Sequence, residues 1–318
     1  MDRLERECDL SVWPDAVAMP RDRLLAEAAG KRALVTLLTE RVDDELLDAA
    51  GDQLLIVANY AVGFDNIDVS ACSRRSVMVS NTPEVLTETT ADMAFALMMA
   101  AARRVAEGDR FLRERRPWTW GPEMMLGYDI YDKTLGVLGF GRIGRAVGRR
   151  AAGFGMTVLY HDPLVPPGST DLGRSMELDE MLAVSDFVSV HVNLSPATRH
   201  LIDAARLQKM KSTAVLVNTA RGPVVDEHAL AEALEAGVIA AAGLDVYENE
   251  PEVDPLLLEQ TRAVLVPHLA SATVDTRIAM GMLAVDNVVA ALGGGRPPTL
   301  LDEEVWQRRQ VEGLGRKR

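Results

Sequence analysis

The chain has 318 residues, 48% of them hydrophobic and 25% charged, which is the composition of a globular protein long enough for two domains. Its 34 Lys and Arg residues against 47 Asp and Glu residues leave a formal net charge of −13. This acidic balance excludes a general attraction to nucleic acid or to an anionic membrane surface, so an anionic ligand requires a local arginine.

The cysteine count and the N-terminus indicate a cytoplasmic protein. The two cysteines, Cys8 and Cys72, belong to no CxxC motif and to no His cluster, which favours a reducing compartment and argues against a structural metal. The first residues, "MDRLERECDL", lack the apolar core of a signal peptide. The most apolar helical run, "MAFALMMAAA", is far shorter than the ~20 residues of a membrane span. We therefore expect a soluble protein without a metal, nucleic-acid or membrane partner.

Short β-branched runs alternate with Ala- and Leu-rich helical patterns along the chain. Several of these runs are apolar throughout, as strands of a parallel sheet covered by helices on both faces must be. The alternation predicts a doubly wound α/β architecture. The predicted strands are 33–38, 54–58, 77–80, 135–139, 157–160, 187–191, 214–218, 240–245 and 264–266.

The segment between Pro83 and Arg104 predicts a long helix that is apolar on nearly every side. Such a helix is buried either in the core of a large domain or against a second subunit, and the pattern alone favours neither. The loop that follows, "RPWTWGPEMMLGYDIYDKT", carries two of the four tryptophans among Gly and Pro residues. Aromatic side chains exposed in such a loop usually form a contact surface.

The run Gly139-Phe140-Gly141-Arg142-Ile143-Gly144 has the spacing of a dinucleotide-binding turn. Three glycines at this spacing are a weak signal alone, because any tight strand-to-helix turn favours Gly. Here a predicted strand precedes the turn, a predicted helix follows it, and the next strand ends at Asp162. This context favours a dinucleotide site over a purely structural turn.

Each glycine of the turn has a separate physical role in such a site. Gly139 makes the tight turn, Gly141 lets the backbone approach the pyrophosphate, and Gly144 lets the helix pack on the strand. The helix N-terminus supplies amide donors and a positive partial charge for the phosphates. Asp162 would accept hydrogen bonds from the ribose hydroxyls and repel a 2′-phosphate, which favours NAD(H) while leaving NADP(H) possible. An Asp at a strand end also caps loops, so this preference stays open.

Polar residues follow three of the later strands. Arg221 stands in "NTARGPVVDE", Asp245 and Glu250 in "GLDVYENEP", and His268 in "PHLASAT". Ligands of an open parallel sheet bind beyond the carboxyl ends of its strands, so we expect these loops to converge. Reduction of a keto acid needs a cation for the carboxylate, a proton donor for the carbonyl oxygen and a carboxylate to orient that donor. Each residue alone also has an ordinary interpretation, as a salt-bridging Arg, a solvated Glu or a strand-end His.

These stretches resemble a known family. "NTPEVLTETTAD", "LGFGRIG", "NTARGPVVDE", "GLDVYENEP" and "PHLASAT" are similar to the signatures of the D-isomer-specific 2-hydroxyacid dehydrogenases, and the resemblance covers nearly the whole chain. Within that superfamily, "NYAVGFDNID", "PWTWGP" and "RPPTLLDEEVW" are most similar to the glyoxylate/hydroxypyruvate reductase branch.

The resemblance implies roles for the substrate-binding and catalytic residues. Arg221 would grip the carboxylate and carbonyl of the substrate, and His268 would be the acid/base. Glu250 would hydrogen-bond the far nitrogen of that imidazole and stabilise the imidazolium. The backbone amides of Val62 and Gly63 would receive the substrate carboxylate.

The resemblance also implies the cofactor contacts. Asp245 would hold the nicotinamide carboxamide, and Thr219 and Ala220 would line the nicotinamide ring. Thr90 resembles the position that contacts the cofactor from the interdomain helix. No residue is expected to bind a metal.

The family layout is a Rossmann nucleotide domain inserted into a smaller flavodoxin-like substrate domain, both with doubly wound parallel sheets. It places the substrate domain at 1–85 and 279–318 and the NAD-binding domain at 86–278, with the active site in the cleft between them. Family members form homodimers through the nucleotide domain, which would give the apolar helix and the tryptophan loop a partner.

The chain departs from the family pattern at three places. It begins after the family's first strand, so we expect the substrate domain to lack that strand, which would leave two neighbours unpaired. We hypothesise a misplaced start codon, which an intact-mass measurement on protein from the native host tests. Asn193 stands where relatives usually have Pro, and Tyr247 where Phe is usual.

Three functions remain in competition at this point. The first is an NAD-dependent reductase of glyoxylate or hydroxypyruvate. A phosphoglycerate dehydrogenase generally has an arginine, suited to a phosphate, where Asn59 stands. A non-catalytic NAD(H) sensor, resembling the C-terminal binding protein corepressors, would keep the same Arg, Glu and His.

Overall fold

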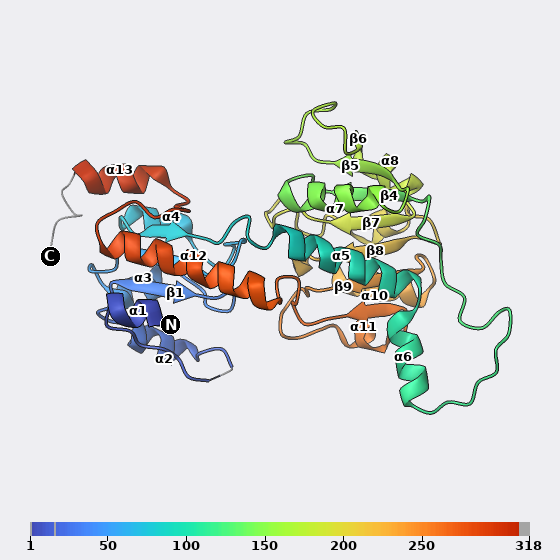
Figure 1. Ribbon diagram of the computed structural model, residues 1–318, viewed down its shortest axis with the longest axis horizontal. Coiled ribbons are helices and arrows are strands. Elements are labelled where there is room, and N and C mark those ends of the chain that lie inside the picture. The colour runs from blue at the N-terminus through green and yellow to red at the C-terminus, as the bar shows by residue number, and fades with distance from the viewer. Residues whose placement is uncertain (1, 16, 312–318) are drawn as a thin grey trace. The chain divides into compact units, whose positions relative to one another are not determined.

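The computed structural model describes residues 2–15 and 17–311 (Figure 1). The chain forms two compact units, the first comprising Met1–Leu86 and Thr273–Arg318 and the second Thr87–Ala272. The expected limits of the inserted domain were 86 and 278. The chain returns to the first unit earlier, because the continuous helix α12 (Val274–Leu292) begins there and packs on the strands of the first unit.

The first unit is built on a three-stranded parallel sheet. Its strands β1 (Ala33–Thr36), β2 (Ile56–Asn59) and β3 (Met78–Ser80) lie in the order β1-β2-β3. Side chains alternate between the faces of a strand, so this sheet contributes to two separate cores. Val57 and Val79 pack in one of them and Ile56, Ala58 and Met78 in the other.

Helices cover both faces of this sheet, as the doubly wound prediction requires. Leu46 and Leu47 of α3 pack with Ala71 of α4 in the core that contains Val57. The opposite core contains Leu4 of α1 and Val288 of α12. The remaining bounds are α1 (Asp2–Glu7), α2 (Arg21–Ala28), α3 (Asp44–Ala50), α4 (Val69–Arg74) and α13 (Glu303–Val311).

One edge of the small sheet is formed by β1. Among the described residues, β1 pairs with β2 alone, and residues 8–15 form no strand. Val35 on β1 is 48% exposed and Leu37 just after it is 51% exposed. The hypothesis of a misplaced start codon stays a hypothesis.

The second unit contains a seven-stranded sheet in the order β10-β9-β8-β7-β4-β5-β6, and every neighbouring pair is parallel. All nine strands predicted from the sequence are present in the two sheets within a few residues of the expected bounds. The two-residue edge strand β6 was not predicted, because it is too short to show a pattern. The bounds are β4 (Thr134–Leu138), β5 (Thr157–His161), β6 (Arg174–Ser175), β7 (Phe187–Val190), β8 (Val215–Asn218), β9 (Ala241–Leu244) and β10 (Ala263–Leu265).

Helices lie on both faces of this larger sheet (Figure 1). The long apolar segment forms α5 (Thr87–Ala102), which packs against β8, β9 and β10, while Met99 on it is 37% exposed. Gly243 allows this contact, since a Cβ there would lie 2.8 Å from the Cβ of Leu97. The other helices are α6 (Val105–Arg113), α7 (Arg142–Ala152), α8 (Leu178–Val184), α9 (Ala204–Leu207), α10 (Glu227–Glu235), α11 (Pro255–Glu259) and the 3-10 helix η1 (Gly222–Val224).

The segment after α5 exposes many large apolar side chains. Figure 1 shows α6 and the long loop after it extending away from the sheet of this unit. Trp118 is 56% exposed and Trp120 is 78% exposed. The other exposed apolar residues of this segment are Val105, Leu112, Leu126, Tyr128 and Tyr131. No helix within the described ranges is long and apolar enough to cross a membrane.

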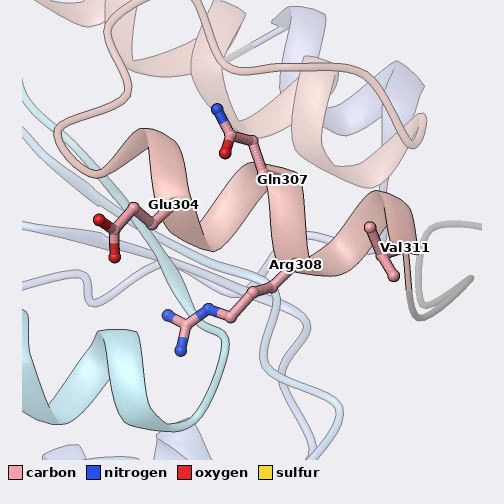
Figure 2. Close-up of a pocket in the computed structure, with 4 residues that line it drawn as sticks. All are labelled: Glu304, Gln307, Arg308 and Val311. Atoms are coloured by element: carbon pink, nitrogen blue, oxygen red, sulfur yellow. The ribbon is translucent and has the colours of Figure 1, made fainter.

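A surface hollow lies beside α13 in the first unit. Figure 2 shows the four side chains that line it, Glu304, Gln307, Arg308 and Val311. None of the site residues predicted from the sequence lines this hollow.

Candidate active site

The glycine turn follows β4 in the geometry that a dinucleotide site needs. Gly139 has a φ of +89°, and a Cβ there would lie 2.8 Å from the backbone of His191. A Cβ on Gly144 would lie 2.1 Å from the carbonyl oxygen of Gly139, so only glycine lets α7 approach the strand this closely. Phe140 is buried and its ring stacks on Tyr160 with centroids 4.2 Å apart.

The outer side of the turn is open. Gly141 is the N-cap residue of α7, and a Cβ there would meet nothing within 4 Å. In the described chain no side chain caps this helix; Arg142 and Ile143 form its first turn. An open approach to an uncapped helix N-terminus fits a pyrophosphate, which the backbone amides and the helix dipole would stabilise.

Asp162 lies at the end of β5, beside the turn. Its Oδ2 accepts a hydrogen bond from the Phe140 amide at 2.7 Å, and its Oδ1 accepts one from the Leu164 amide at 2.9 Å. A carboxylate offers about four acceptor positions, so lone pairs remain for ribose hydroxyls. Asp162 therefore stabilises the glycine turn, and its expected contact with the ribose stays a prediction.

Arg221 lies just beyond β8 in a loop that Asn218 organises. The Nδ2 of Asn218 donates to the Arg221 carbonyl at 3.0 Å, and its Oδ1 accepts from the Ala220 amide at 3.0 Å. Gly222 follows, and a Cβ there would lie 1.9 Å from the carbonyl carbon of Tyr247. The backbone after Arg221 therefore packs directly on the loop after β9.

Glu250 and His268 form a hydrogen-bonded pair between two loops. The Nδ1 of His268 lies 2.8 Å from the Oε2 of Glu250, whose Oε1 accepts from the Tyr247 amide at 3.0 Å. Burial opposes ionisation of Glu250, but the hydrogen bond and charge of His268, the Tyr247 amide and the charge of Arg221 together lower its pKa. The positive charge of Arg221 thus acts on the same carboxylate that bonds to the imidazole.

Asp245 anchors the loop that carries His268. Its carbonyl accepts from the His268 amide at 2.9 Å, and its carboxylate accepts from the amides of Leu269 and Ala270. The side chain is fully buried, and burial raises its pKa although both amides oppose that shift. His268 has a φ of +52°, an unfavourable conformation for a residue with a Cβ, which this anchorage maintains.

Thr219 and Thr90 are buried in the same unit. Thr219 is 7% exposed, and its Oγ1 has no hydrogen-bond partner in the described chain. An enclosed hydroxyl without a partner at the end of β8 fits a position that a bound cofactor would complete. Ala220 follows it directly, and Thr90 lies in the first turn of α5 and is 3% exposed.

Val62 and Gly63 lie in the first unit, in the turn after β2. The Nδ2 of Asn81 donates to the Val62 carbonyl at 2.8 Å, and the Nδ2 of Asn59 donates to the Gly63 carbonyl at 2.8 Å. Asn59 is fully buried and accepts from the Thr36 hydroxyl at 3.2 Å. Buried amide side chains thus fix the shape of this turn within the first unit.

Most of the second unit matches a known protein family. Residues 95–270 match the family model described as D-isomer specific 2-hydroxyacid dehydrogenase, NAD binding domain. The chain belongs to the D-isomer-specific 2-hydroxyacid dehydrogenases. The family and the fold class predicted from the sequence are confirmed, and this 2-hydroxyacid dehydrogenase is an enzyme with a nicotinamide-cofactor domain.

Its relatives cover nearly the whole chain. The dehydrogenase is 48% identical to a glyoxylate reductase of Thermococcus kodakarensis, over 98% of this chain and 95% of the relative. It superimposes on a glyoxylate reductase from Paecilomyes thermophila with a TM-score of 0.85 at 37% identity, covering 95% and 94% of the chains. An NADPH-dependent glyoxylate/hydroxypyruvate reductase from Sinorhizobium meliloti, solved with NADP and malonate, gives a TM-score of 0.77 at 37% identity, over 85% and 84%.

Sequence reasoning missed three residues of this 2-hydroxyacid dehydrogenase that shape the site. Gly222 permits the close approach of the Arg221 loop, and its signal was available as the glycine next to the arginine in "TARGP". Glu227 and the hydroxyl of Tyr247 hold the loop that carries Glu250, and their partners are backbone groups that no sequence pattern shows.

Proposed function

We propose that the protein reduces a small 2-keto acid, glyoxylate or hydroxypyruvate, to the D-2-hydroxy acid with NADH or NADPH. The observation that carries this proposal is the 2.8 Å contact between His268 and Glu250, with the charge of Arg221 acting on the same carboxylate. The names of the relatives, glyoxylate reductases and a glyoxylate/hydroxypyruvate reductase, support the choice of substrate.

Each of the three side chains has one task in this reaction. The guanidinium of Arg221 binds the substrate carboxylate through paired N–H donors. Because Nδ1 of His268 is bonded to Glu250, the Nε2 faces the substrate and donates its proton to the carbonyl oxygen. Glu250 orients the ring and stabilises the imidazolium before that proton leaves. The reduced nicotinamide, when bound, supplies the hydride for the carbonyl carbon.

The cofactor site comprises the glycine turn, Asp162, Thr219, Ala220 and Thr90, with Asp245 toward the nicotinamide. Asp162 favours NADH over NADPH, because its carboxylate beside the turn would repel a 2′-phosphate. The Sinorhizobium meliloti relative is NADPH-dependent by name, so the preference of this chain needs its own measurement. The expected contact of the Val62 and Gly63 backbone amides with the substrate carboxylate stays a prediction.

We also propose that the enzyme is a homodimer through the second unit. The exposed aromatic side chains of Trp118, Trp120 and Tyr131 support this proposal, because exposed aromatic residues often mark a contact surface. Sedimentation velocity of the wild type should give a dimer, and replacing both tryptophans with serine should shift the population to monomer. A monomeric wild type would contradict this proposal.

A cytoplasmic location, expected from the cysteine count, stays a prediction.

The deciding experiment is NADH and NADPH oxidation with glyoxylate, hydroxypyruvate, pyruvate and 3-phosphohydroxypyruvate. Turnover on the order of tens per second with the first two supports the reductase. A preference for 3-phosphohydroxypyruvate would favour a phosphoglycerate dehydrogenase activity instead. Absence of turnover with all four acids would favour a nucleotide-sensing module.

A further inference from the structure

The side chain of Glu227 is buried at the first turn of α10 and bonds to one loop twice. It is 7% exposed. Its Oε2 accepts from the Glu248 amide at 2.6 Å and its Oε1 accepts from the Asp254 amide at 2.6 Å. A single carboxylate therefore fixes both ends of the segment 248–254, which we call the Glu250 loop.

The Glu250 loop determines where the carboxylate of Glu250 lies relative to His268. Glu250 stands between the two amides that Glu227 binds, and its Oε2 bonds to the His268 imidazole. Neither Glu248 nor Asp254 bonds to His268 itself. Glu227 thus acts on the acid/base pair only through the backbone of this loop.

Tyr247, the residue just before the Glu250 loop, also holds this loop in place. Its amide donates to Glu250 at 3.0 Å, while its hydroxyl donates to the Val266 carbonyl at 3.0 Å. Val266 stands two residues before His268 and also accepts the His268 amide at 3.1 Å. The Tyr247 hydroxyl therefore links the strand end that carries His268 to the loop that carries Glu250.

We propose that Glu227 and Tyr247 are positioning residues for the Glu250–His268 pair, an inference that rests on the proposed function. A carboxylate suits the first position because it accepts two amides at once, whereas a carboxamide accepts with only one of its two end atoms. A buried amide that loses its acceptor destabilises the arrangement that buries it, so the loop shifts. Shifting the Glu250 carboxylate weakens both the orientation and the charge stabilisation of the imidazole.

Other ionisable groups contact this loop and belong in the interpretation of any pH dependence. Glu248 bonds to Arg199 at 2.7 Å and to the Nε2 of His200 at 2.8 Å. Asp254 bonds to the Nδ1 of His228 at 2.9 Å. The His200 and His228 side chains are 36% and 64% exposed, and His200→Gln and His228→Gln variants separate their titration from that of the active site.

The test compares Glu227→Gln and Tyr247→Phe with wild type. Glu227→Gln should lower kcat about tenfold at unchanged Kd for NADH, a part of the usual general acid–base contribution. The basic limb of the kcat–pH profile should move to lower pH by on the order of one unit, since a displaced carboxylate stabilises the imidazolium less. Tyr247→Phe should lower kcat about threefold and move the basic limb in the same direction. Hydrogen–deuterium exchange should accelerate at the amides of Glu248 and Asp254 in Glu227→Gln.

A matched control exists in the same unit. Glu232→Gln on α10 changes an exposed side chain and should leave kcat, the pH profile and the exchange unchanged. If Glu227→Gln does not fold, the kcat–pH profile of Tyr247→Phe is the test, because this variant keeps the aromatic ring. A fall in kcat without a shift of the basic limb, or faster exchange with wild-type kinetics, overturns the inference. Wild type that reduces no keto acid refutes the proposed function, whereas unchanged exchange in Glu227→Gln refutes the positioning role independently.

Discussion

The Nδ1 of His268 and the Oε2 of Glu250 lie 2.8 Å apart, and this contact assigns the two imidazole nitrogens to different tasks. One nitrogen is committed to the carboxylate, so the other is the only one that can exchange a proton with a substrate. Eighteen residues separate the two positions in the chain, and they come together because β9 and β10 are neighbours in the sheet.

Replacing His268 with alanine should therefore abolish proton transfer and leave the nucleotide site intact. We expect kcat to fall by roughly 10²- to 10⁴-fold, while the Kd for NADH, measured by fluorescence titration, stays within about twofold. His228→Ala, which changes an exposed histidine of the same unit, is the control. Equal losses of turnover and NADH binding would show that His268 is structural.

Arg221→Lys should raise the Michaelis constant for the keto acid. A lysine ammonium is a point charge and lacks the paired N–H donors that match a carboxylate, so a rise of about tenfold or more is expected. Steady-state kinetics with glyoxylate give the measurement, and Arg113→Lys on the exposed side of α6 provides the comparison. Wild-type kinetics in Arg221→Lys would remove the arginine from the substrate site.

Gly222→Ala should disturb the site through packing alone. A Cβ at this position would lie 1.9 Å from the carbonyl carbon and oxygen of Tyr247, which are backbone atoms and cannot move alone. We expect a loss of about 2 kcal/mol or more in the free energy of unfolding, because the backbone at residue 222 must move away from the backbone of Tyr247. Turnover should fall as well, since Arg221 moves with its neighbour. Gly121→Ala, where the new Cβ meets nothing within 4 Å, should leave the melting temperature unchanged. An unchanged melting temperature for Gly222→Ala would contradict the packing described above.

The sequence was sufficient to predict the strands and the glycine turn, because both depend on local chemistry. Apolar runs follow from burial on two faces, and Gly139 and Gly144 follow from a positive φ and a contact that excludes a Cβ. The convergence of Arg221 with Glu250 was also predictable, because the carboxyl ends of parallel strands share one edge.

The side chains that hold the loops of the site through hydrogen bonds to the backbone were not predictable in the same way. Glu227 bonds to backbone amides in a loop more than twenty positions away, and backbone amides leave no sequence pattern that identifies their acceptor. Asp245 has a structural role that the sequence did not indicate, because both of its carboxylate oxygens accept hydrogen bonds from amides of the loop after His268. Its predicted contact with the nicotinamide carboxamide stays a prediction.

Asp162→Asn should reduce the discrimination against NADPH. The substitution removes the negative charge that would repel a 2′-phosphate, while the remaining carbonyl oxygen can still accept from the Phe140 amide. Asp162→Ala should relax the preference too, but it should also raise the Michaelis constants for both cofactors because the turn loses its brace. The ratio of kcat/KM for NADH to that for NADPH is the measurement. An unchanged ratio in both variants would exclude Asp162 from cofactor selection.

His191 should make the fold sensitive to acid. Burial lowers the pKa of His191 from its ordinary value of 6.5 to about 3, and its Nε2 lies 2.7 Å from the Ser189 hydroxyl. Between these two values the unfolded chain binds a proton that the native protein does not, so the free energy of unfolding falls as the pH decreases. The slope from this group is at most about 1.4 kcal/mol per pH unit. It is absent above pH 6.5, where both states are neutral.

Denaturant unfolding at several pH values between 7 and 4 measures this contribution. His191→Gln lowers stability at every pH if the Ser189 contact weakens, but it should remove the slope due to this histidine, and the slope is the readout. His228→Gln tests a contribution to the free energy of unfolding that changes with pH in the opposite direction. The hydrogen bond to Asp254 raises the pKa of His228, so its contribution is present below pH 6.5 and is lost as the pH rises through the native pKa. A His191→Gln variant with the wild-type slope would show that burial does not lower the pKa of His191 in the native protein.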